Sequence, residues 1–184
     1  MSTFTLHTLE TAPEQSQPLL QNSQQTFGMI PGLHAVMAEA PTVLEAYKNL
    51  HELFQNTSFD AEELTVVWQT INVEHGCHYC VPAHTAIANM MNVDPTLTDA
   101  LRNGDAMTTP KLQALHDTTL AMLRQRGQLS DSQMQAFFAA GYGPQQLLEI
   151  TLGMAQKVMS NYINHFANTP VDPPFKPFAW EKSD

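Results

Sequence analysis

The sequence predicts an all-α protein. Apolar residues recur at helical spacing in most segments, and proline or capping residues precede several of these segments. No pair of alternating segments joined by a hairpin turn indicates a β-sheet. With 184 residues, of which 43% are hydrophobic, the chain is long enough for one domain with a substantial core.

The first third of the chain divides into three predicted helices. A polar, glutamine-rich helix is expected over residues 13–27, and residues 28–32 (Gly-Met-Ile-Pro-Gly) form a turn. A short helix follows over residues 33–40. Proline is favoured in the first turn of a helix, so Pro41 begins a longer helix that continues through Phe54. The apolar stripe of this longer helix consists of Val43, Leu44, Tyr47, Leu50 and Phe54.

The centre of the chain contains two predicted helices separated by Gly76. Asp60 is an N-cap with Glu63 three residues later, which is the spacing of a capping box. The first helix runs from there towards Glu74, and the second from about Cys77 to Met91. The apolar side of the first helix consists of Leu64, Val67, Trp68 and Ile71.

Four further helices are predicted from cap signals in the second half of the chain. They are bounded by Asp94-Pro95 and Asn103-Gly104, by Thr109-Pro110 and Arg126-Gly127, by Ser130 and Ala140, and by Pro144 and about Ala167.

The segment after Thr169 is predicted to be an irregular arm. Four prolines exclude a regular α-helix, and three aromatic residues lie between or after them. Such an arm is expected either to lie on a protein surface, which includes that of a neighbouring subunit, or to fray as a tail. The residues concerned are Pro170, Pro173, Pro174, Pro177, Phe175, Phe178 and Trp180.

Composition excludes several classes of partner. The formal net charge is −10, from 18 acidic and 8 basic residues, and no Lys/Arg cluster is present, so neither nucleic acid nor an anionic membrane is an expected partner. No apolar run has the length of a membrane span, and the first residues lack the pattern of a signal peptide. Two cysteines in one CxxC and none elsewhere are typical of a cytoplasmic redox or metal site.

The most informative motif is Gly76-Cys77-His78-Tyr79-Cys80-Val81-Pro82-Ala83-His84. If residues 77–84 are helical, both cysteines and His84 fall at i, i+3 and i+7 and share one face. The start of a helix lowers the pKa of a thiol, so this spacing can supply a nucleophile, a resolving partner and a base.

Four other interpretations of this motif compete with a redox dithiol. Haem attachment needs CxxCH and is excluded by Val81, and a thioredoxin fold would place the motif after a strand. Structural zinc would need a fourth ligand beside the two cysteines and His84, which His75 or His78 could supply. Two buried, inert cysteines are the fourth interpretation. A redox dithiol in an all-helical protein, without metal or cofactor, fits the pattern best.

Residues 72–88, which include the G-C-x-Y-C-x-x-x-H pattern, resemble the AhpD-like alkylhydroperoxidase group of the carboxymuconolactone decarboxylase superfamily. The resemblance extends through residues 140–142, the helix from Gln145 and residues 161–172, and covers about residues 25–175. It implies one all-α domain of antiparallel helices, which would span residues 1–184. Residues 1–30 would then form an N-terminal helical extension, and residues 169–184 the irregular C-terminal arm.

The resemblance also implies a thiol-dependent peroxidase or disulfide reductase that assembles as a homo-oligomer, a dimer or an assembly of dimers. By analogy, Cys80 attacks the hydroperoxide, His84 accepts its proton and Cys77 resolves the sulfenic acid to a disulfide. An external dithiol would then reduce that disulfide.

One position departs from the family pattern. The family carries a glutamate twelve positions before the first cysteine as a relay to the histidine, and here that position is Thr65. Glu74 is the expected substitute because it lies close to the motif in sequence.

Two rival functions remain open at the level of sequence. A carboxymuconolactone-decarboxylase-like enzyme would do acid–base chemistry and would not need the cysteine pair. A non-enzymatic redox sensor would use the disulfide to change its assembly.

Overall fold

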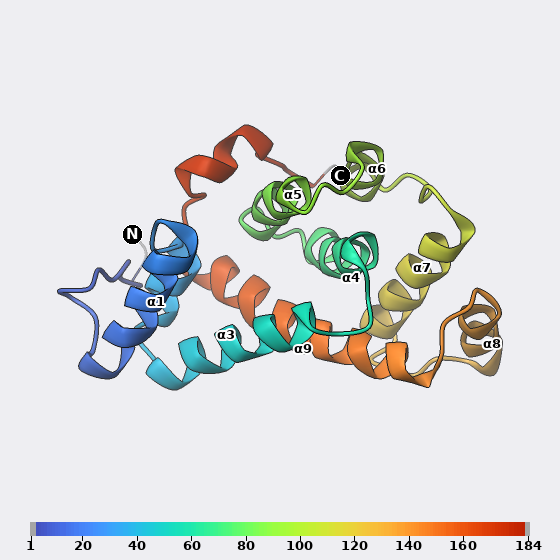
Figure 1. Cartoon of the computed structure of the whole chain (residues 1–184), viewed down its shortest axis with the longest axis horizontal. Helices are drawn as coiled ribbons and strands as arrows, with labels where there is room; N and C mark the ends of the chain where they lie inside the picture. Colours follow the sequence, from blue (N-terminus) through green and yellow to red (C-terminus); the bar gives the residue numbers. More distant parts are fainter. Residues whose placement is uncertain (1–2, 183–184) are drawn as a thin grey trace.

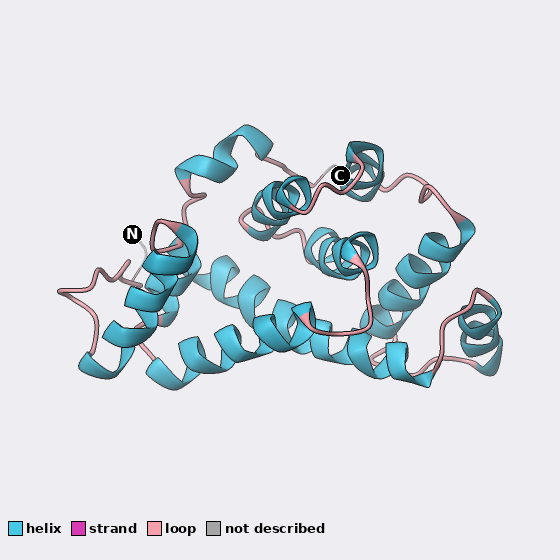
Figure 2. Cartoon of the chain, in the orientation of Figure 1, coloured by secondary structure: helices cyan, strands magenta, loops and turns pink. Residues whose placement is uncertain are grey.

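The computed structural model describes residues 3–182 and contains no strand in this range, so the predicted all-α fold is confirmed (Figure 2). The first two residues of the predicted extension and the last two of the predicted arm lie outside the described residues. The α-helices are α1 (Gln17–Phe27), α2 (Gly32–Met37), α3 (Pro41–Gln55), α4 (Ala61–Glu74), α5 (Cys80–Met90), α6 (Pro95–Asn103), α7 (Pro110–Arg124), α8 (Asp131–Ala139) and α9 (Pro144–Ala167). The 3-10 helices Glu14–Ser16 and Pro173–Phe178 precede and follow them.

Helix α9 is the longest helix and extends along most of the molecule (Figure 1). It packs against α2, α3, α4 and α5. Helix α4 occupies the centre, where it contacts α5, α6, α7 and α9. Helices α1 and α2 lie near the C-terminal end of α9, and α7 and α8 lie near its N-terminal end (Figure 1).

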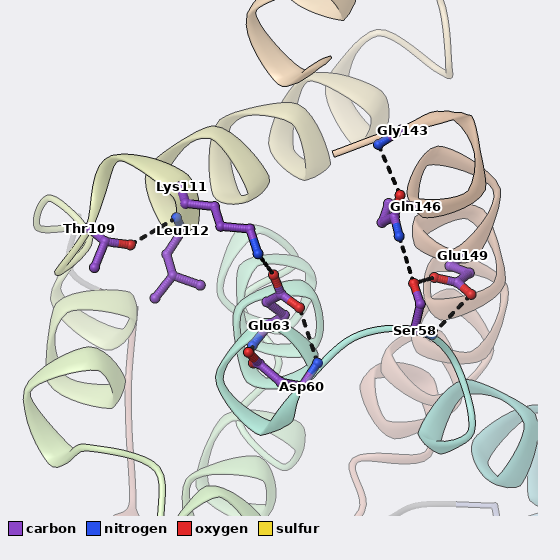
Figure 3. Close-up of polar contacts among 9 residues, drawn as sticks. All are labelled: Ser58, Asp60, Glu63, Thr109, Lys111, Leu112, Gly143, Gln146 and Glu149. Carbon is purple, nitrogen blue, oxygen red and sulfur yellow. Dashed lines mark hydrogen bonds and ion pairs between the residues drawn. The ribbon is translucent and has the colours of Figure 1, made fainter. Parts of the chain in front are cut away.

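Four predicted helix starts are confirmed by their capping contacts. Glu63 N donates to Asp60 Oδ1 at 2.9 Å and Asp60 N donates to Glu63 Oε2 at 3.1 Å, which is the expected capping box. Lys111 also binds Glu63, with Nζ 2.8 Å from Oε1, so the cap of α4 is tied to α7 (Figure 3). Asp94, Thr109 and Ser130 cap their helices as predicted.

The loop before α4 is tied to the start of α9. Gln146 Oε1 accepts from Gly143 N at 2.9 Å, and its Nε2 donates to Ser58 Oγ at 2.7 Å. Ser58 in turn donates from both its backbone and its hydroxyl to Glu149 (Figure 3). These hydrogen bonds fix the position of the first turn of α9 relative to the loop that leads into α4.

The described residues form two apolar clusters. The first joins α3, α4, α6, α7, α8 and α9 around Trp68 and Phe54, both fully buried. The second joins Leu20 of α1, Leu33 of α2 and Leu44 of α3 to both cysteines. Residues of the predicted N-terminal extension therefore help to enclose the thiol pair.

The bounds of three helices differ from the prediction. Helix α1 begins at Gln17 rather than at Pro13, and the 3-10 helix Glu14–Ser16 precedes it. Helix α5 begins at Cys80 rather than Cys77, because Gly76 adopts a φ of +64° and leaves residues 77–79 in a turn. Helix α2 covers Gly32–Met37 rather than residues 33–40. The cysteines are thus divided between a turn and a helix start instead of sharing one helix.

The C-terminal arm packs against other helices of the same chain (Figure 1). Its 3-10 helix packs on α5, and Trp180 Nε1 donates to Arg102 O at 3.0 Å. The Arg102 guanidinium donates to Phe178 O and Ala179 O, and Lys182 Nζ donates to Glu74 O at 2.9 Å. Within residues 3–182, no helix is long and apolar enough to span a membrane.

We expect Gly153→Ala to destabilise the protein. A Cβ at this position would lie 2.7 Å and 2.8 Å from ring atoms of buried Phe54 and 3.1 Å from Val67 Cγ1. Overpacking of this kind costs about 1–3 kcal/mol, against a helix-propensity gain of about 0.5–1 kcal/mol. Urea unfolding should therefore show a lower free energy of unfolding than for wild type.

Thr151→Ala, at an exposed position of the same helix, is the matched control and should change stability by no more than about 0.5 kcal/mol. Phe54→Leu should recover part of the loss when it is combined with Gly153→Ala. A stabilised Gly153→Ala protein would contradict the expected close packing.

Candidate active site

The two cysteines lie side by side where α4 connects to α5. Both are free thiols, and Cys77 and Cys80 are 0% and 2% exposed. Cys77 N donates to Asn72 O at 3.0 Å, which holds the turn against the end of α4. Cys80 N donates to Cys77 Sγ at 3.3 Å. The first sulfur therefore lies at the start of the helix that carries the second cysteine.

Helix α9 supplies the other contacts of Cys80. Asn164 Nδ2 donates to Cys80 Sγ at 3.2 Å, and Ser160 Oγ lies 3.8 Å from the same sulfur. These side chains belong to a stripe of polar residues on α9 that are all 0% exposed. The stripe consists of Gln156, Lys157, Ser160, Asn161 and Asn164.

The cysteine motif identified none of the residues of this stripe. Lys157, Ser160, Asn161 and Asn164 are spaced i, i+3, i+4 and i+7, which places them on one helix face. A polar stripe within a long helix of an apolar domain is the signal that could have identified its members. The i, i+4 spacing of Asn161 and His165 predicts a polar network between them, but His165 is exposed and Asn161 instead binds α4.

Asn161 belongs to a chain of amides between α9 and α4. Its Nδ2 donates to Asn72 Oδ1 at 3.0 Å, and His75 Nδ1 lies 2.8 Å from its Oδ1. Asn72 Nδ2 donates to Gln69 Oε1 at 3.0 Å and, at 3.4 Å, to Cys80 O. Buried amides of this kind fix the position of the backbone that carries the thiols.

His84 lies on α5 and contacts a buried lysine. Its Nε2 is 2.7 Å from Lys157 Nζ, and both side chains are buried. The imidazole also packs on Trp68, with ring centroids 4.8 Å apart. His84 Nδ1 has no hydrogen-bond partner among the described residues.

The environment separates the pKa values of the two thiols. Burial raises the pKa of Cys80, but the Cys77 thiol, the Lys157 charge and the Ser160 and Asn164 side chains together lower it to about 5. The hydrogen bond to Cys80, burial and the negative charge of Cys80 raise the pKa of Cys77. The two pKa values are therefore shifted in opposite directions, and Cys80 is the more acidic thiol of the pair.

The same environment keeps His84 neutral. Burial, followed by the positive charge of Lys157, holds the pKa of His84 well below its usual value. Burial also lowers the pKa of Lys157, while the negative charge of the cysteines opposes that shift.

The segment after α9 covers the motif. Thr169 O accepts a hydrogen bond from His78 Nε2 at 3.0 Å. The Tyr79 hydroxyl donates to Asp172 Oδ2 and accepts from Leu33 N at 3.2 Å. Both residues between the cysteines are thus bound to residues 169–172 in this closed arrangement.

The two relay positions that the sequence suggests do not bring a carboxylate to His84. Glu74 binds Arg124, with Oε1 2.7 Å from Nε and Oε2 2.8 Å from Nη2, and faces α7 instead of the site. Thr65 Oγ1 donates to Ala61 O in its own helix at 2.8 Å. The expectation that Glu74 takes the place of the missing glutamate is therefore not met by the geometry. The structure places Cys77 beside Cys80, and His84 one helical turn after Cys80 in contact with Lys157, while Glu74 lies against α7.

Within residues 3–182, no group of three or more His, Cys, Asp and Glu side chains is arranged to hold a metal ion. The two histidines that could have supplied a fourth zinc ligand have other partners. His75 lies against Asn161, and His78 binds a backbone carbonyl.

No protein-family model and no curated protein sequence matches the chain. Among solved structures, the chain resembles an uncharacterized peroxidase-related protein from Ralstonia eutropha JMP134, described as an alkylhydroperoxidase AhpD core. The TM-score is 0.84 at 18% identity, over 95% of this chain and 94% of that one. A peroxidase-related protein from Silicibacter sp. TM1040 gives a TM-score of 0.77 at 17% identity, with 94% of both chains covered. The debrominase Bmp8 in complex with 2,3,4-tribromopyrrole gives 0.78 at 16%, over 96% and 95%.

These similarities show that the chain has the AhpD-like fold that the cysteine motif predicted. They extend over nearly the whole length of each protein, so the fold includes both the N-terminal helices and most of the C-terminal segment.

The buried histidines predict a loss of stability in mild acid. Burial, with the Lys48 charge, lowers the pKa of His34 to about 3, and burial, with the Lys157 charge, lowers that of His51 to about 4. Below about pH 6.5 the unfolded chain binds protons on these histidines and the folded chain does not. The free energy of unfolding should therefore fall as the pH decreases from 6.5 towards 4, by about 3 kcal/mol for His51 alone.

Urea unfolding of wild type and His51→Gln at several pH values between 7 and 4 tests this expectation. The variant should lose less stability over that range, because glutamine does not titrate and can still accept the bond from Gln156 Nε2. His165→Gln, at an exposed position, is the control and should keep the wild-type slope. An unchanged slope in His51→Gln would contradict the assignment of a neutral buried His51.

Proposed function

We propose that the protein is a thiol-dependent oxidoreductase of the AhpD type, which reduces hydroperoxides through Cys80 and Cys77. The observation that supports this most directly is the geometry of the two free thiols: Cys80 N donates to Cys77 Sγ at 3.3 Å, and Asn164 Nδ2 donates to Cys80 Sγ at 3.2 Å. These surroundings lower the pKa of Cys80 and raise that of Cys77. The peroxidase-related proteins of the same fold support the same class of reaction.

The first step is attack of the Cys80 thiolate on the distal oxygen of a hydroperoxide. The S–O bond forms as the O–O bond breaks, which leaves a sulfenic acid on Cys80 and releases an alkoxide that becomes the alcohol on protonation. Asn164 Nδ2 holds the sulfur in place for this attack, because it donates to Sγ at 3.2 Å.

The second step is attack of Cys77 on the Cys80 sulfenic acid. The S–S bond forms, the S–O bond breaks, and the proton of the Cys77 thiol leaves with the hydroxyl group as water. The raised pKa of Cys77 keeps it protonated until this step. An external dithiol then reduces the disulfide by thiol–disulfide exchange, returns two protons and two electrons, and is itself oxidised.

Access to the thiols requires movement of the covering residues, because neither thiol is more than 2% exposed. The bonds of Thr169 to His78 and of Asp172 to Tyr79 are among the contacts that would open. The same opening would admit the external dithiol.

Reductive dehalogenation is the second function to test, since a debrominase is among the proteins of this fold. An aryl bromide and two thiols give the arene, a disulfide and hydrogen bromide, so the same cysteine pair would supply both electrons. A redox sensor would be favoured by a disulfide that forms without catalytic turnover. A decarboxylase-like enzyme would be favoured by acid–base turnover that does not need the cysteines.

We predict that Cys77 and Cys80 form a reversible disulfide after mild peroxide treatment. Intact-protein mass spectrometry should show the loss of two hydrogen atoms, which dithiothreitol should restore. Cys77→Ser is the control, because it leaves one cysteine and cannot form the bond within the chain. A mass loss that is absent, or that survives the reductant, would rule out the proposed redox pair.

We predict that Cys80→Ser abolishes peroxide consumption, while Cys77→Ser reacts once and stops at the sulfenic acid. The reason is that only Cys80 has a pKa low enough to be a thiolate at neutral pH. A dimedone-type reagent should label Cys80 in the Cys77→Ser protein. Labelling of Cys77 in the Cys80→Ser protein, without labelling of Cys80 in the Cys77→Ser protein, would reverse the two roles.

The substrate class is tested with hydrogen peroxide, an alkyl hydroperoxide and a tribromopyrrole, each with a dithiol donor. Turnover of a hydroperoxide that depends on both cysteines supports the proposal. Turnover of the bromopyrrole alone would assign the chain to dehalogenation, and turnover of none would favour the sensor.

A further inference from the structure

The Lys157 side chain lies 0% exposed between α9 and α5, where the motif cysteines and His84 are also buried. We propose that Lys157 sets the charge state of this site: it holds Cys80 as a thiolate and keeps His84 as a neutral hydrogen-bond acceptor. Lys157 is a positioning residue here, and its role deepens the proposed function because peroxide attack needs the thiolate.

The first argument is that Lys157 lacks a carboxylate partner. Its Nζ contacts His84 Nε2 at 2.7 Å, and no Asp or Glu forms an ion pair with it among residues 3–182. Burial of a charged ammonium group without an opposite charge costs several kcal/mol. A protonated Lys157 therefore requires an anion from another kind of side chain.

The second argument is that Cys80 is the one group in these surroundings suited to carry that negative charge. From α3, His51 has a pKa lowered to about 4 and is neutral, and burial raises the pKa of Tyr47, so its phenol stays protonated. From α5 and the turn before it, Cys80 has a lowered pKa and Cys77 a raised one.

Helix α4 also packs against α9 but supplies no charge to this centre. Its Glu63 and Glu74 bind Lys111 and Arg124. A Cys80 thiolate would thus balance the Lys157 charge within the same buried site, where Ser160 and Asn164, on the helix face that carries Lys157, contact the Cys80 sulfur.

The third argument concerns the direction of the hydrogen bond to His84. An ammonium group can only donate, so His84 Nε2 must accept, and the single proton of the neutral ring is then on Nδ1. His84 Nε2 is consequently occupied and cannot receive the proton of Cys80. The positive charge of Lys157, rather than a base at His84, then favours the Cys80 thiolate.

Lys157 and a carboxylate relay have opposite effects on the basicity of His84. A glutamate beside the histidine would raise the basicity of the imidazole, whereas the Lys157 charge lowers it. Neither Thr65 nor Glu74 reverses this effect, because one binds its own helix and the other binds Arg124. The ammonium group replaces the relay with a fixed positive charge.

The test measures the thiolate directly, without peroxide, in a Cys77→Ser background where Cys80 is the only cysteine. The pH dependence of alkylation by iodoacetamide gives the midpoint for Cys80, and the midpoint is insensitive to the slow access that burial imposes. We expect Lys157→Met to raise this midpoint by at least about one pH unit, which is about a tenfold loss of thiolate on the acidic side. Lys176→Met, the same substitution at an exposed position, should leave the midpoint unchanged.

A second measurement determines the tautomer and the titration of His84. Long-range ¹H–¹⁵N spectra of the full-length wild-type protein should show His84 with its proton on Nδ1 and no titration in the usual pH range of a free imidazole, because its pKa is held well below that range. In Lys157→Met the ring should lose this fixed form, because its acceptor bond is gone and the opposing charge is removed.

An unchanged Cys80 midpoint in folded Lys157→Met would overturn the proposal. Should that variant fail to fold, as judged by circular dichroism, the wild-type spectrum decides, since a proton on His84 Nε2 would exclude donation by an ammonium group. If the midpoint shifts as expected but the wild type consumes no hydroperoxide, the Lys157 assignment stands and the proposed peroxidase function fails.

Discussion

The burial of Lys157 is the constraint on which the rest of the site depends. A lysine side chain with no exposed surface needs an acceptor and an anion close by, and α5 supplies both as His84 and Cys80. These requirements fix the register of α9 against α5, since a shift of one residue would move Lys157 off the shared face. The hydrogen bond from the Asn161 side chain to the Asn72 side chain fixes the position of α9 along α4 in the same way.

Close packing one turn earlier on α9 makes this contact possible. Gly153 precedes Lys157 by four residues and lies on the same face of the helix. The absence of a side chain there allows the Phe54 ring and Val67 to approach the backbone of α9. Helix α9 can therefore sit close enough to α3 and α4 for the next turn to reach the cysteine motif. The apolar cluster around Trp68 and the polar stripe of α9 are two parts of one packing arrangement.

Local signals in the sequence predicted the fold and half of the site. Caps such as Asp60 and Asp94 act within a few residues, so helix starts could be located without knowledge of the tertiary structure. The CxxC motif located the adjacent thiols for the same reason, and the catalytic roles of Cys77, Cys80 and His84 stay predictions. The choice of Glu74 failed because proximity in sequence does not determine direction: the left-handed turn at Gly76 separates Glu74 from the motif and leaves its carboxylate facing Arg124.

Lys157 lies 73 residues from His84. Only its place in a buried polar stripe could have indicated that contact.

The replacement of a carboxylate by an ammonium group changes what the site must still provide. With a carboxylate relay, the histidine would act as a base and deprotonate the cysteine during catalysis. With Lys157, the thiolate exists before substrate arrives, because the pKa of Cys80 is already about 5. The site must still supply a proton to the departing alkoxide and an opening through which the substrate reaches the buried sulfur. His84, neutral and with Nδ1 unpartnered among the described residues, is then free of the basic role and retains a polar N–H inside the closed site. Activity at neutral pH should accordingly depend less on the titration of a histidine than on the contacts of residues 169–172 that cover the motif.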